Sequence, residues 1–166
     1  MTSHRELAEL EFHQRRYFLA AKFAQYALAE DDEDYATQRI LGLSCLTLGE
    51  LDPGIEALEQ AALLRPLDVS AQIELAIAYG QAGRTDLSRD LLMAQATSGM
   101  LAPSELLRVA VGLEAADAPR LAMEACRQAG QLAPDSAEIH YQMGYFANRC
   151  GYPPNVSESL IRHAIK

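Results

Sequence analysis

The feature that most restricts the fold of this chain is a constant spacing of about 34 residues between similar positions in the sequence. Pro66, in the stretch LLRPLD, and Pro134, in QLAPDS, are separated by twice that spacing. When the sequence is written in rows of 34 residues, it divides into five units, 1–34, 35–68, 69–102, 103–136 and 137–166. A column is then the set of residues at the same position in each row. A fixed period of this length is typical of repeat proteins, in which each unit buries its apolar face against its neighbours.

Two columns of this arrangement keep one kind of residue in all five rows. The seventh column is always apolar and reads Leu7, Leu41, Leu75, Val109 and Met143. The eighth column is always small and reads Ala8, Gly42, Ala76, Ala110 and Gly144. A small residue beside a large one lets two helices approach closely, because the large side chain fills the groove beside the small one. Ala and Leu are abundant and Trp is absent, which also favours an all-helical chain.

Each unit is predicted to be a hairpin of two helices. The second helix carries a mostly small twentieth column, Ala20, Gly54, Ser88, Ala122 and Val156. Its twenty-fourth column reads Ala24, Leu58, Leu92, Cys126 and Leu160. Between the two helices, Gly49, Gly83 and Gly151 share one column, and glycine there accepts the left-handed backbone that ends a first helix.

Residues favoured at helix ends stand where the hairpins predict them. Capping-box spacing within residues 3–6 and 135–138 predicts the starts of two first helices. The predicted starts of second helices are Asp52 with Pro53, Thr85, and Asp117 shortly before Pro119. Pro66 and Pro134 are predicted to end second helices, because proline cannot continue a helix.

With these columns the sequence resembles the tetratricopeptide repeat family. The unit of that family has about 34 residues, arranged as two antiparallel helices, with small and large residues at these columns and a proline near its end. The resemblance covers essentially the whole chain and is strongest in residues 35–68 and 103–136. The proline column departs from the family pattern, since it holds Asp32 in the first unit and Met100 in the third. A different helical-hairpin array of similar period is the alternative.

The predicted fold class is therefore all-α: a right-handed α-α superhelix, or solenoid, of about five helical hairpins in a single domain, the last hairpin being incomplete. The last row stops within an apolar second helix, whereas solenoids usually end in a polar capping helix. We therefore expect the natural protein to continue beyond Lys166. A short protein whose last helix frays is the alternative.

The resemblance implies that the first helices line a concave groove through columns two, five, nine and twelve, which helical spacing places on one face. In the middle units this face is apolar, so it is predicted to hold an amphipathic helix or an extended peptide of a partner protein. The residues predicted to line the groove are Arg39, Leu43, Ile73, Ile77, Leu107, Arg108, Val111, Tyr141, Tyr145 and Arg149. The alternative is that neighbouring first helices cover most of these side chains.

Charge and composition restrict the partner and the compartment. The net charge is −9 with no offsetting stripe of Lys and Arg, so neither nucleic acid nor a membrane is expected as a partner. No membrane span or secretory signal is apparent, and a cytoplasmic protein with free thiols is predicted. Cys45 and Cys126 fall in core columns, whereas Cys150, beside a turn, is predicted to be the reactive thiol.

No catalytic motif is apparent, and no cofactor or metal is predicted. The sequence lacks HExxH and the glycine motifs that bind phosphate. His140 and His163 fall in packing columns of one unit and are predicted to pack together rather than to bind a metal. The acidic run of residues 30–34 lacks the alternating ligands of a calcium loop, and it is predicted to be a solvated turn that could steer a basic partner.

Three functions are compatible with this pattern. The first is a non-catalytic scaffold that binds a protein or peptide in the apolar groove, and the second is the recruiting arm of a larger enzyme, such as a transferase, that continues beyond Lys166. The third is self-association through the open C-terminal end. Some family members bind a terminal carboxylate with a clamp, but the corresponding columns here hold Arg5, Glu9, Ile40, Ser70 and Glu74. Only the first of these fits, so such a clamp is not expected.

Overall fold

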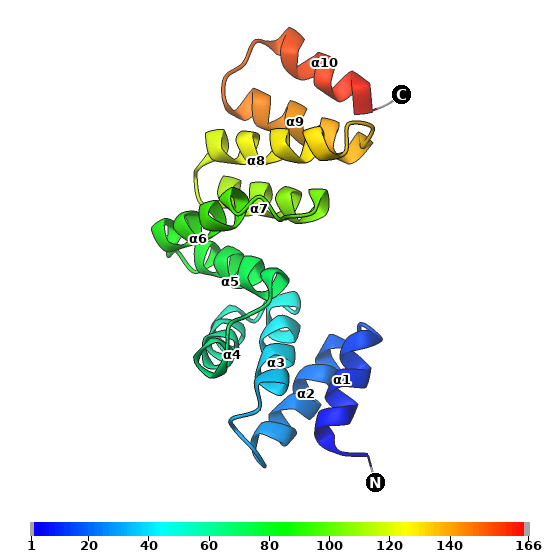
Figure 1. The fold of residues 1–166 in the computed structure, drawn as a ribbon, viewed down its shortest axis with the longest axis vertical. Helices are drawn as coiled ribbons and strands as arrows, with labels where there is room; N and C mark the ends of the chain where they lie inside the picture. The colour runs from blue at the N-terminus through cyan, green and yellow to red at the C-terminus, as the bar shows by residue number, and fades with distance from the viewer. Residues whose placement is uncertain (1, 165–166) are drawn as a thin grey trace. The chain divides into compact units, whose positions relative to one another are not determined.

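A computed structural model describes residues 2–164 of the chain, with side chains as far as residue 162. This part of the chain forms ten α-helices and no strand (Figure 1). The first helices are α1 (His4–His13), α3 (Tyr35–Thr47), α5 (Val69–Gln81), α7 (Pro103–Ala115) and α9 (Ala137–Arg149). The second helices are α2 (Tyr17–Leu28), α4 (Leu51–Leu64), α6 (Thr85–Thr97), α8 (Pro119–Leu132) and α10 (Pro154–Ala164). The prediction of an all-α fold built from five helical hairpins is confirmed.

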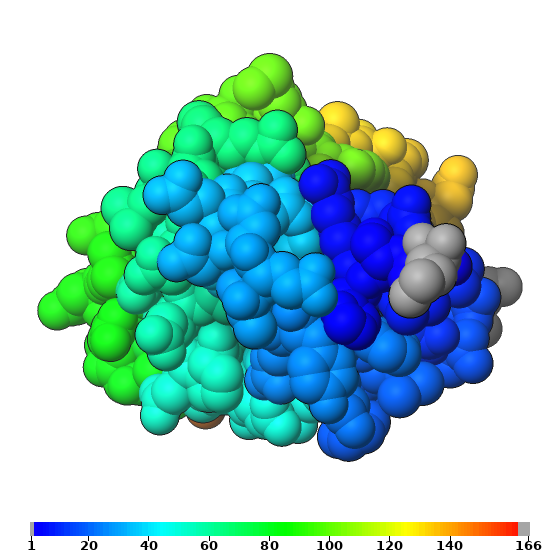
Figure 2. Space-filling model, turned by 90° about the horizontal axis from the view of Figure 1, so that it is seen from below, coloured from blue at the N-terminus to red at the C-terminus, as the bar shows by residue number. Residues whose placement is uncertain are grey.

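Contacts between helices group the chain into two compact units, residues 1–78 and 79–166. In the first unit, α1 packs on α2, α2 on α3, and α3 on α4. Figure 2 shows the blue N-terminal helices beside the light-blue and cyan residues of the next hairpin. In the second unit, α6 packs on α7, α7 on α8, α8 on α9, and α9 on α10. Among the described helices, none combines the length and the apolar character that a membrane span requires.

The turn inside each hairpin follows the predicted period. Its left-handed residue recurs in the fifteenth column of every row, as Arg15, Gly49, Gly83, Asp117 and Gly151. The glycines have φ of 77° to 82°, as predicted, and the two other residues have φ of 58° and 55°. Glycine adopts this backbone without steric cost, whereas Arg15 and Asp117 adopt it under strain.

The starts of the first helices agree largely with the prediction. Ser3 Oγ accepts a hydrogen bond from the Glu6 amide (3.2 Å), and Glu6 Oε2 accepts one from the Ser3 amide (2.8 Å), so the capping box of α1 is confirmed. The cap of α9 is Ser136, whose hydroxyl accepts from the Ile139 amide (3.4 Å). It therefore lies one residue later than the predicted box beginning at Asp135.

The predicted side-chain caps of the second helices are wrong. Helices α4 and α6 have Glu50 and Arg84 at the N-cap, and neither side chain accepts a hydrogen bond from its helix. Asp117 is the left-handed turn residue, and Ala118 is the N-cap of α8. The physical reason is the N-cap residue itself: Glu50, Arg84 and Ala118 are not favoured capping residues, and their ψ of 57° to 83° departs from the extended backbone from which a capping side chain reaches its helix. Pro119 does occupy the first turn of α8, as predicted.

The two prolines follow the ends of second helices, as predicted. Helix α4 ends at Leu64, two residues before Pro66, and α8 ends at Leu132, two residues before Pro134. Helices α2 and α6 have no such proline, and they end earlier in their rows, at Leu28 and Thr97. Proline therefore marks the end of a unit but is not required to stop the helix.

The small residues of the eighth column lie where paired helices touch. Ala8, Ala76 and Ala110 are fully buried. A Cβ added to Gly42 would lie 2.6 Å from Leu58 Cγ, which is closer than carbon atoms can approach. Only glycine allows α3 and α4 to pack at this distance.

The second helix of the last unit is displaced by one residue within its row, which corrects two predicted columns. The turn between α9 and α10 has four residues, 150–153, where the other hairpins have three. Val156 is 37% exposed and Ser157 is buried, so Ser157 takes the place of the small twentieth column. A Cβ added to Gly144 would clash with Ile161 Cγ1, so Ile161 rather than Leu160 fills the twenty-fourth column.

Candidate partner-binding surface

The residues predicted to line the groove differ widely in exposure. Leu43, Ile73 and Leu107 expose 8%, 0% and 9% of their surface, so they offer almost no area to a partner. Ile77 is half-buried on α5. These four side chains are therefore covered wholly or in part by the chain itself.

The exposed apolar members gather on α7 and α9, in the second unit. Val111 is 50% exposed, Tyr141 is 54% exposed and Tyr145 is 42% exposed. They line one pocket of about 290 Å³, which we call the α7–α9 pocket. Its lining residues are Val111, Glu114, Tyr141, Gln142, Tyr145 and Phe146.

Helical spacing explains why these side chains share one surface. Val111 and Glu114 are three residues apart on α7, and Tyr141 and Tyr145 are four apart on α9, so each pair lies on one side of its helix. The opposite sides hold the buried residues Val109, Ala110 and Leu113 of α7 and Ile139 and Ala147 of α9. Both helices are therefore apolar on a packed face and on part of an exposed face.

A carboxylate links the two walls of the α7–α9 pocket. The Tyr145 hydroxyl donates a hydrogen bond to Glu114 Oε1 (3.3 Å), and Arg149 Nη2 lies 3.2 Å from the same oxygen. The side chain of Glu114 is 24% exposed and that of Arg149 is 50% exposed. These contacts restrain Tyr145 from α7. Arg108 is half-buried on α7 outside the pocket lining, and burial lowers the pKa of its guanidinium.

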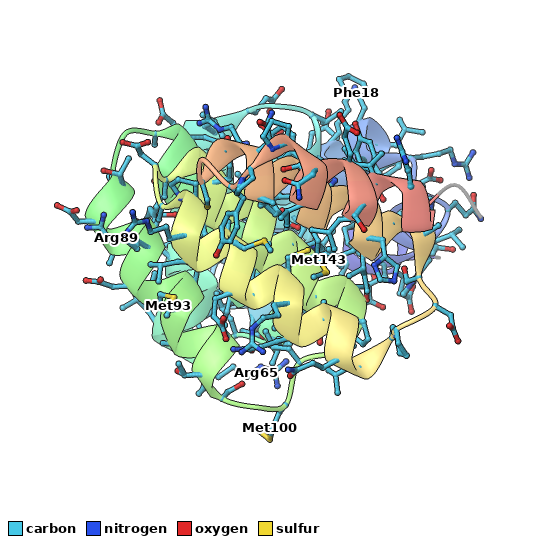
Figure 3. The ribbon with its side chains drawn as sticks, turned by 90° about the horizontal axis from the view of Figure 1, so that it is seen from above. Phe18, Arg65, Arg89, Met93, Met100 and Met143 are labelled. Atoms are coloured by element: carbon cyan, nitrogen blue, oxygen red, sulfur yellow. The ribbon has the colours of Figure 1, made fainter. Side chains whose placement is uncertain are left out.

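Arg39, in the first unit, lines a second pocket of about 630 Å³. It forms a bidentate pair with Asp68, with Nε 2.5 Å from Oδ1 and Nη2 3.1 Å from Oδ2. The hydrogen bond to Arg39 lowers the pKa of Asp68, and the same bond raises the pKa of Arg39. Across this pocket the Arg65 guanidinium, labelled in Figure 3, lies 3.8 Å from the centroid of the Tyr35 ring. Arg39 is thus engaged by its own chain.

The Arg39–Asp68 pair repeats an ion pair of the preceding row. Arg5 Nε lies 3.5 Å from Asp34 Oδ2, and both pairs join the fifth column of a row to its last column. Sequence reasoning missed this repeated ion pair, although the first and second rows both have an Arg in the fifth column and an Asp in the last column. In the fourth row the same two columns hold Leu107 and Ser136, which cannot form an ion pair.

The remaining polar candidates are histidines, and two of them contact oxygen atoms of the same chain. Among the described side chains, no three His, Cys, Asp or Glu groups are placed to hold a metal ion. His140 Nε2 lies 2.6 Å from the Pro134 carbonyl oxygen, and the predicted contact of His140 with His163 falls outside the described side chains. His4 Nδ1 lies 2.8 Å from Glu30 Oε1.

The cysteines occupy the environments that their columns predict. Cys45 and Cys126 are fully buried, and all three thiols are free. Burial raises the pKa of Cys45 to about 11, with a further contribution from Glu50, and it raises the pKa of Cys126 to about 12. Cys150 is half-buried and lines a pocket of about 460 Å³ near the start of α8.

Sequence reasoning did not select three residues of the α7–α9 pocket: Glu114, Gln142 and Phe146. Glu114 stands in the twelfth column, which was expected to face the groove, so its position was a usable signal. Phe146 is 1% exposed and still lines the pocket, which spacing alone does not reveal.

Comparisons with solved structures identify the fold. No protein-family model matches the sequence. No curated protein matches it either. The chain is similar to MamA from AMB-1 (TM-score 0.79, 21% identity, 97% of this chain and 95% of that one covered). It is also similar to MamA from Desulfovibrio magneticus RS-1 (TM-score 0.81, 13% identity, 98% and 91% covered). MamA is a tetratricopeptide-repeat protein, so this chain has the tetratricopeptide-repeat fold, as predicted.

Proposed function

We propose that this chain, with its tetratricopeptide-repeat fold, is a non-catalytic scaffold that binds a segment of a partner protein on the groove face of its first helices. The observation that carries the proposal is the α7–α9 pocket, because Val111, Tyr141 and Tyr145 stand in columns expected to face a groove and are 42% to 54% exposed. Exposed apolar and aromatic side chains around a hollow are typical of interaction surfaces.

The size and rigidity of the pocket support a peptide ligand. A volume of about 290 Å³ accepts one or two side chains, and it is small for an organic cofactor. The pocket walls belong to α7 and α9, which both pack on α8, and Glu114 restrains Tyr145 from the opposite wall. A partner segment would therefore meet a surface that is already ordered, which reduces the entropy lost by the scaffold on binding.

The proposal is tested by affinity capture from lysate of the source organism with the unaltered chain and with Val111→Arg. We expect the substitution to abolish capture of the partner, because it places a long charged side chain in the pocket wall. Circular dichroism should show unchanged helix content, since Val111 is half exposed. The matched control is Leu132→Arg, which introduces the same charge at a 61% exposed position of α8. Equal capture by both variants would exclude this surface as the binding site.

A further inference from the structure

We infer that the α7–α9 pocket takes a cationic side chain, Lys or Arg, from the partner segment; this inference rests on the proposed function. The charge of the partner side chain that the pocket prefers is therefore positive. Of the six lining residues only Glu114 carries a formal charge, and no Lys or Arg lines the pocket. A carboxylate on the partner would therefore meet a carboxylate of like charge at short range.

Glu114 has capacity for another hydrogen-bond donor. The contacts that hold it are the hydrogen bond from the Tyr145 hydroxyl (3.3 Å) and the ion pair with Arg149 (3.2 Å), both at Oε1. An ionised carboxylate offers about four lone-pair sites, so an incoming ammonium or guanidinium group could be accepted beside Arg149. An apolar side chain would add no donor to the carboxylate and would displace water from its remaining lone pairs, which is unfavourable.

The other walls suit the rest of a Lys or Arg side chain. The pocket is lined by three aromatic residues, Tyr141, Tyr145 and Phe146. The face of an aromatic ring is negative and attracts a cation. Val111 adds an apolar surface against which the methylene groups of the stem can pack.

Cationic groups already near the pocket do not cancel this preference. Arg149 is the cation that pairs with Glu114, and its side chain is half exposed, so it can share the carboxylate or move toward solvent. Arg108 is half-buried on α7 and lies outside the lining. Residues 79–166, which hold the pocket, carry eight Lys or Arg and nine Asp or Glu, so the preference comes from the lining residues and not from long-range attraction.

The test is an NMR titration of the full chain with three small probes, N-acetyl-arginine amide, N-acetyl-norleucine amide and N-acetyl-glutamate amide. We expect the arginine amide to shift the resonances of Val111, Tyr141 and Tyr145 with a dissociation constant about tenfold or more below that of the norleucine amide. The glutamate amide should cause no shift at these residues. Raising the NaCl concentration should weaken binding of the arginine amide and leave the norleucine amide unaffected.

Two variants test whether Glu114 is the source of the preference for the arginine amide. Glu114→Gln should remove the advantage of the arginine amide over the norleucine amide. Glu124→Gln should leave it intact, because Glu124 carries the same charge on α8 and also pairs with an arginine, Arg127 (2.7 Å), but lies outside the pocket lining. Equal binding of the arginine and norleucine amides, tighter binding of the glutamate amide, or no shift with any probe would overturn the inference. The capture experiment with Val111→Arg would still decide the scaffold function independently.

Discussion

One residue in each hairpin, the one in the fifteenth column, adopts the left-handed backbone of the turn, and its identity affects the stability of the fold. Asp117 has φ of 55°, where three other rows place glycine. We predict that Asp117→Gly raises the free energy of unfolding by about 0.5–1 kcal/mol, because the strain of a left-handed non-glycine residue exceeds the entropy cost of glycine. Urea denaturation at constant m-value measures the change.

Two further variants separate backbone strain from charge. Asp117→Ala removes the carboxylate but keeps the strain, so it should not reproduce the gain. A Cβ added to Gly49 would meet nothing within 4 Å, so Gly49→Ala tests the backbone alone and should cost about 1 kcal/mol. A loss of stability in Asp117→Gly would contradict this account of the turn. The sequence misassigned Asp117 because an acidic residue shortly before a proline also has the composition of a helix start.

At the scale of paired helices, close packing distinguishes glycines that are otherwise alike. Gly42 on α3 faces Leu58 Cγ at 2.6 Å and the Gly54 carbonyl oxygen at 3.0 Å from the position of an added Cβ. We predict that Gly42→Ala lowers the free energy of unfolding by about 1–3 kcal/mol, because the hairpin must separate to admit the methyl group. Thermal and urea unfolding measure the loss.

The matched control is Gly130→Ala on α8. The nearest atom to a Cβ there is Met143 Sδ at 3.2 Å, which belongs to a flexible side chain that can move. Alanine is also the better helix former, so this variant should be neutral or more stable by up to about 1 kcal/mol. If both variants lost the same stability, close approach would not be the reason for glycine in the eighth column.

The ion pair between Arg39 and Asp68 links the α3 helix to the segment before α5, and it predicts a pH dependence. The pKa of Asp68 is lowered in the folded chain, mainly by its hydrogen bond to Arg39, so the pair stabilises the fold above the ordinary aspartate pKa. That contribution is lost as the pH falls through the lowered value. We predict that Asp68→Asn is less stable than the unaltered chain at about pH 7 by under about 1 kcal/mol, since the pair is partly exposed.

The difference between the two proteins should narrow as the pH is lowered from about 7 through the lowered pKa of Asp68, and it should close at a pH where Asp68 is protonated in both the folded and the unfolded states. Chemical denaturation over this range of pH measures it, and Asp52→Asn, which changes an exposed carboxylate on α4, controls for net charge. A difference that persisted at low pH would show that the carboxylate of Asp68 is not its source.

The sequence predicted these elements well and their contacts less well, for a physical reason. The repeat period equals the length of two helices and their turns, so it predicts where every first helix lies within its row. It cannot show the extra residue in the turn before α10, because that shift appears only when Ser157 is buried and Val156 is not. Likewise, spacing places Leu107 and Val111 on one helix face, but only the distance to neighbouring helices decides that the first is covered and the second exposed.

At the scale of the whole molecule, the net charge of −9 is divided unequally. Residues 1–78 carry six Lys or Arg and fourteen Asp or Glu, a net charge of −8, whereas residues 79–166 carry eight and nine, a net charge of −1. The total, taken alone, describes an acidic protein. When the net charge is counted for each unit, the first compact unit is strongly acidic, and the second, which holds the α7–α9 pocket, is nearly neutral.

This division predicts that salt stabilises the first unit selectively. Raising NaCl from about 20 mM to about 200 mM shortens the screening length from roughly 20 Å to roughly 7 Å. Screening weakens the ion pairs of Arg5 and Arg39, but it weakens the repulsion among fourteen carboxylates more, because six cations cannot balance them. We expect amide hydrogen exchange in α1–α4 to slow by a factor of about 5, corresponding to about 1 kcal/mol, and exchange in α7–α9 to change by less than about twofold. Replacing Asp31, Asp32 and Glu33 by their amides should reduce the salt effect in α1–α4, and an equal effect of salt on both units would show that local charge is not its cause.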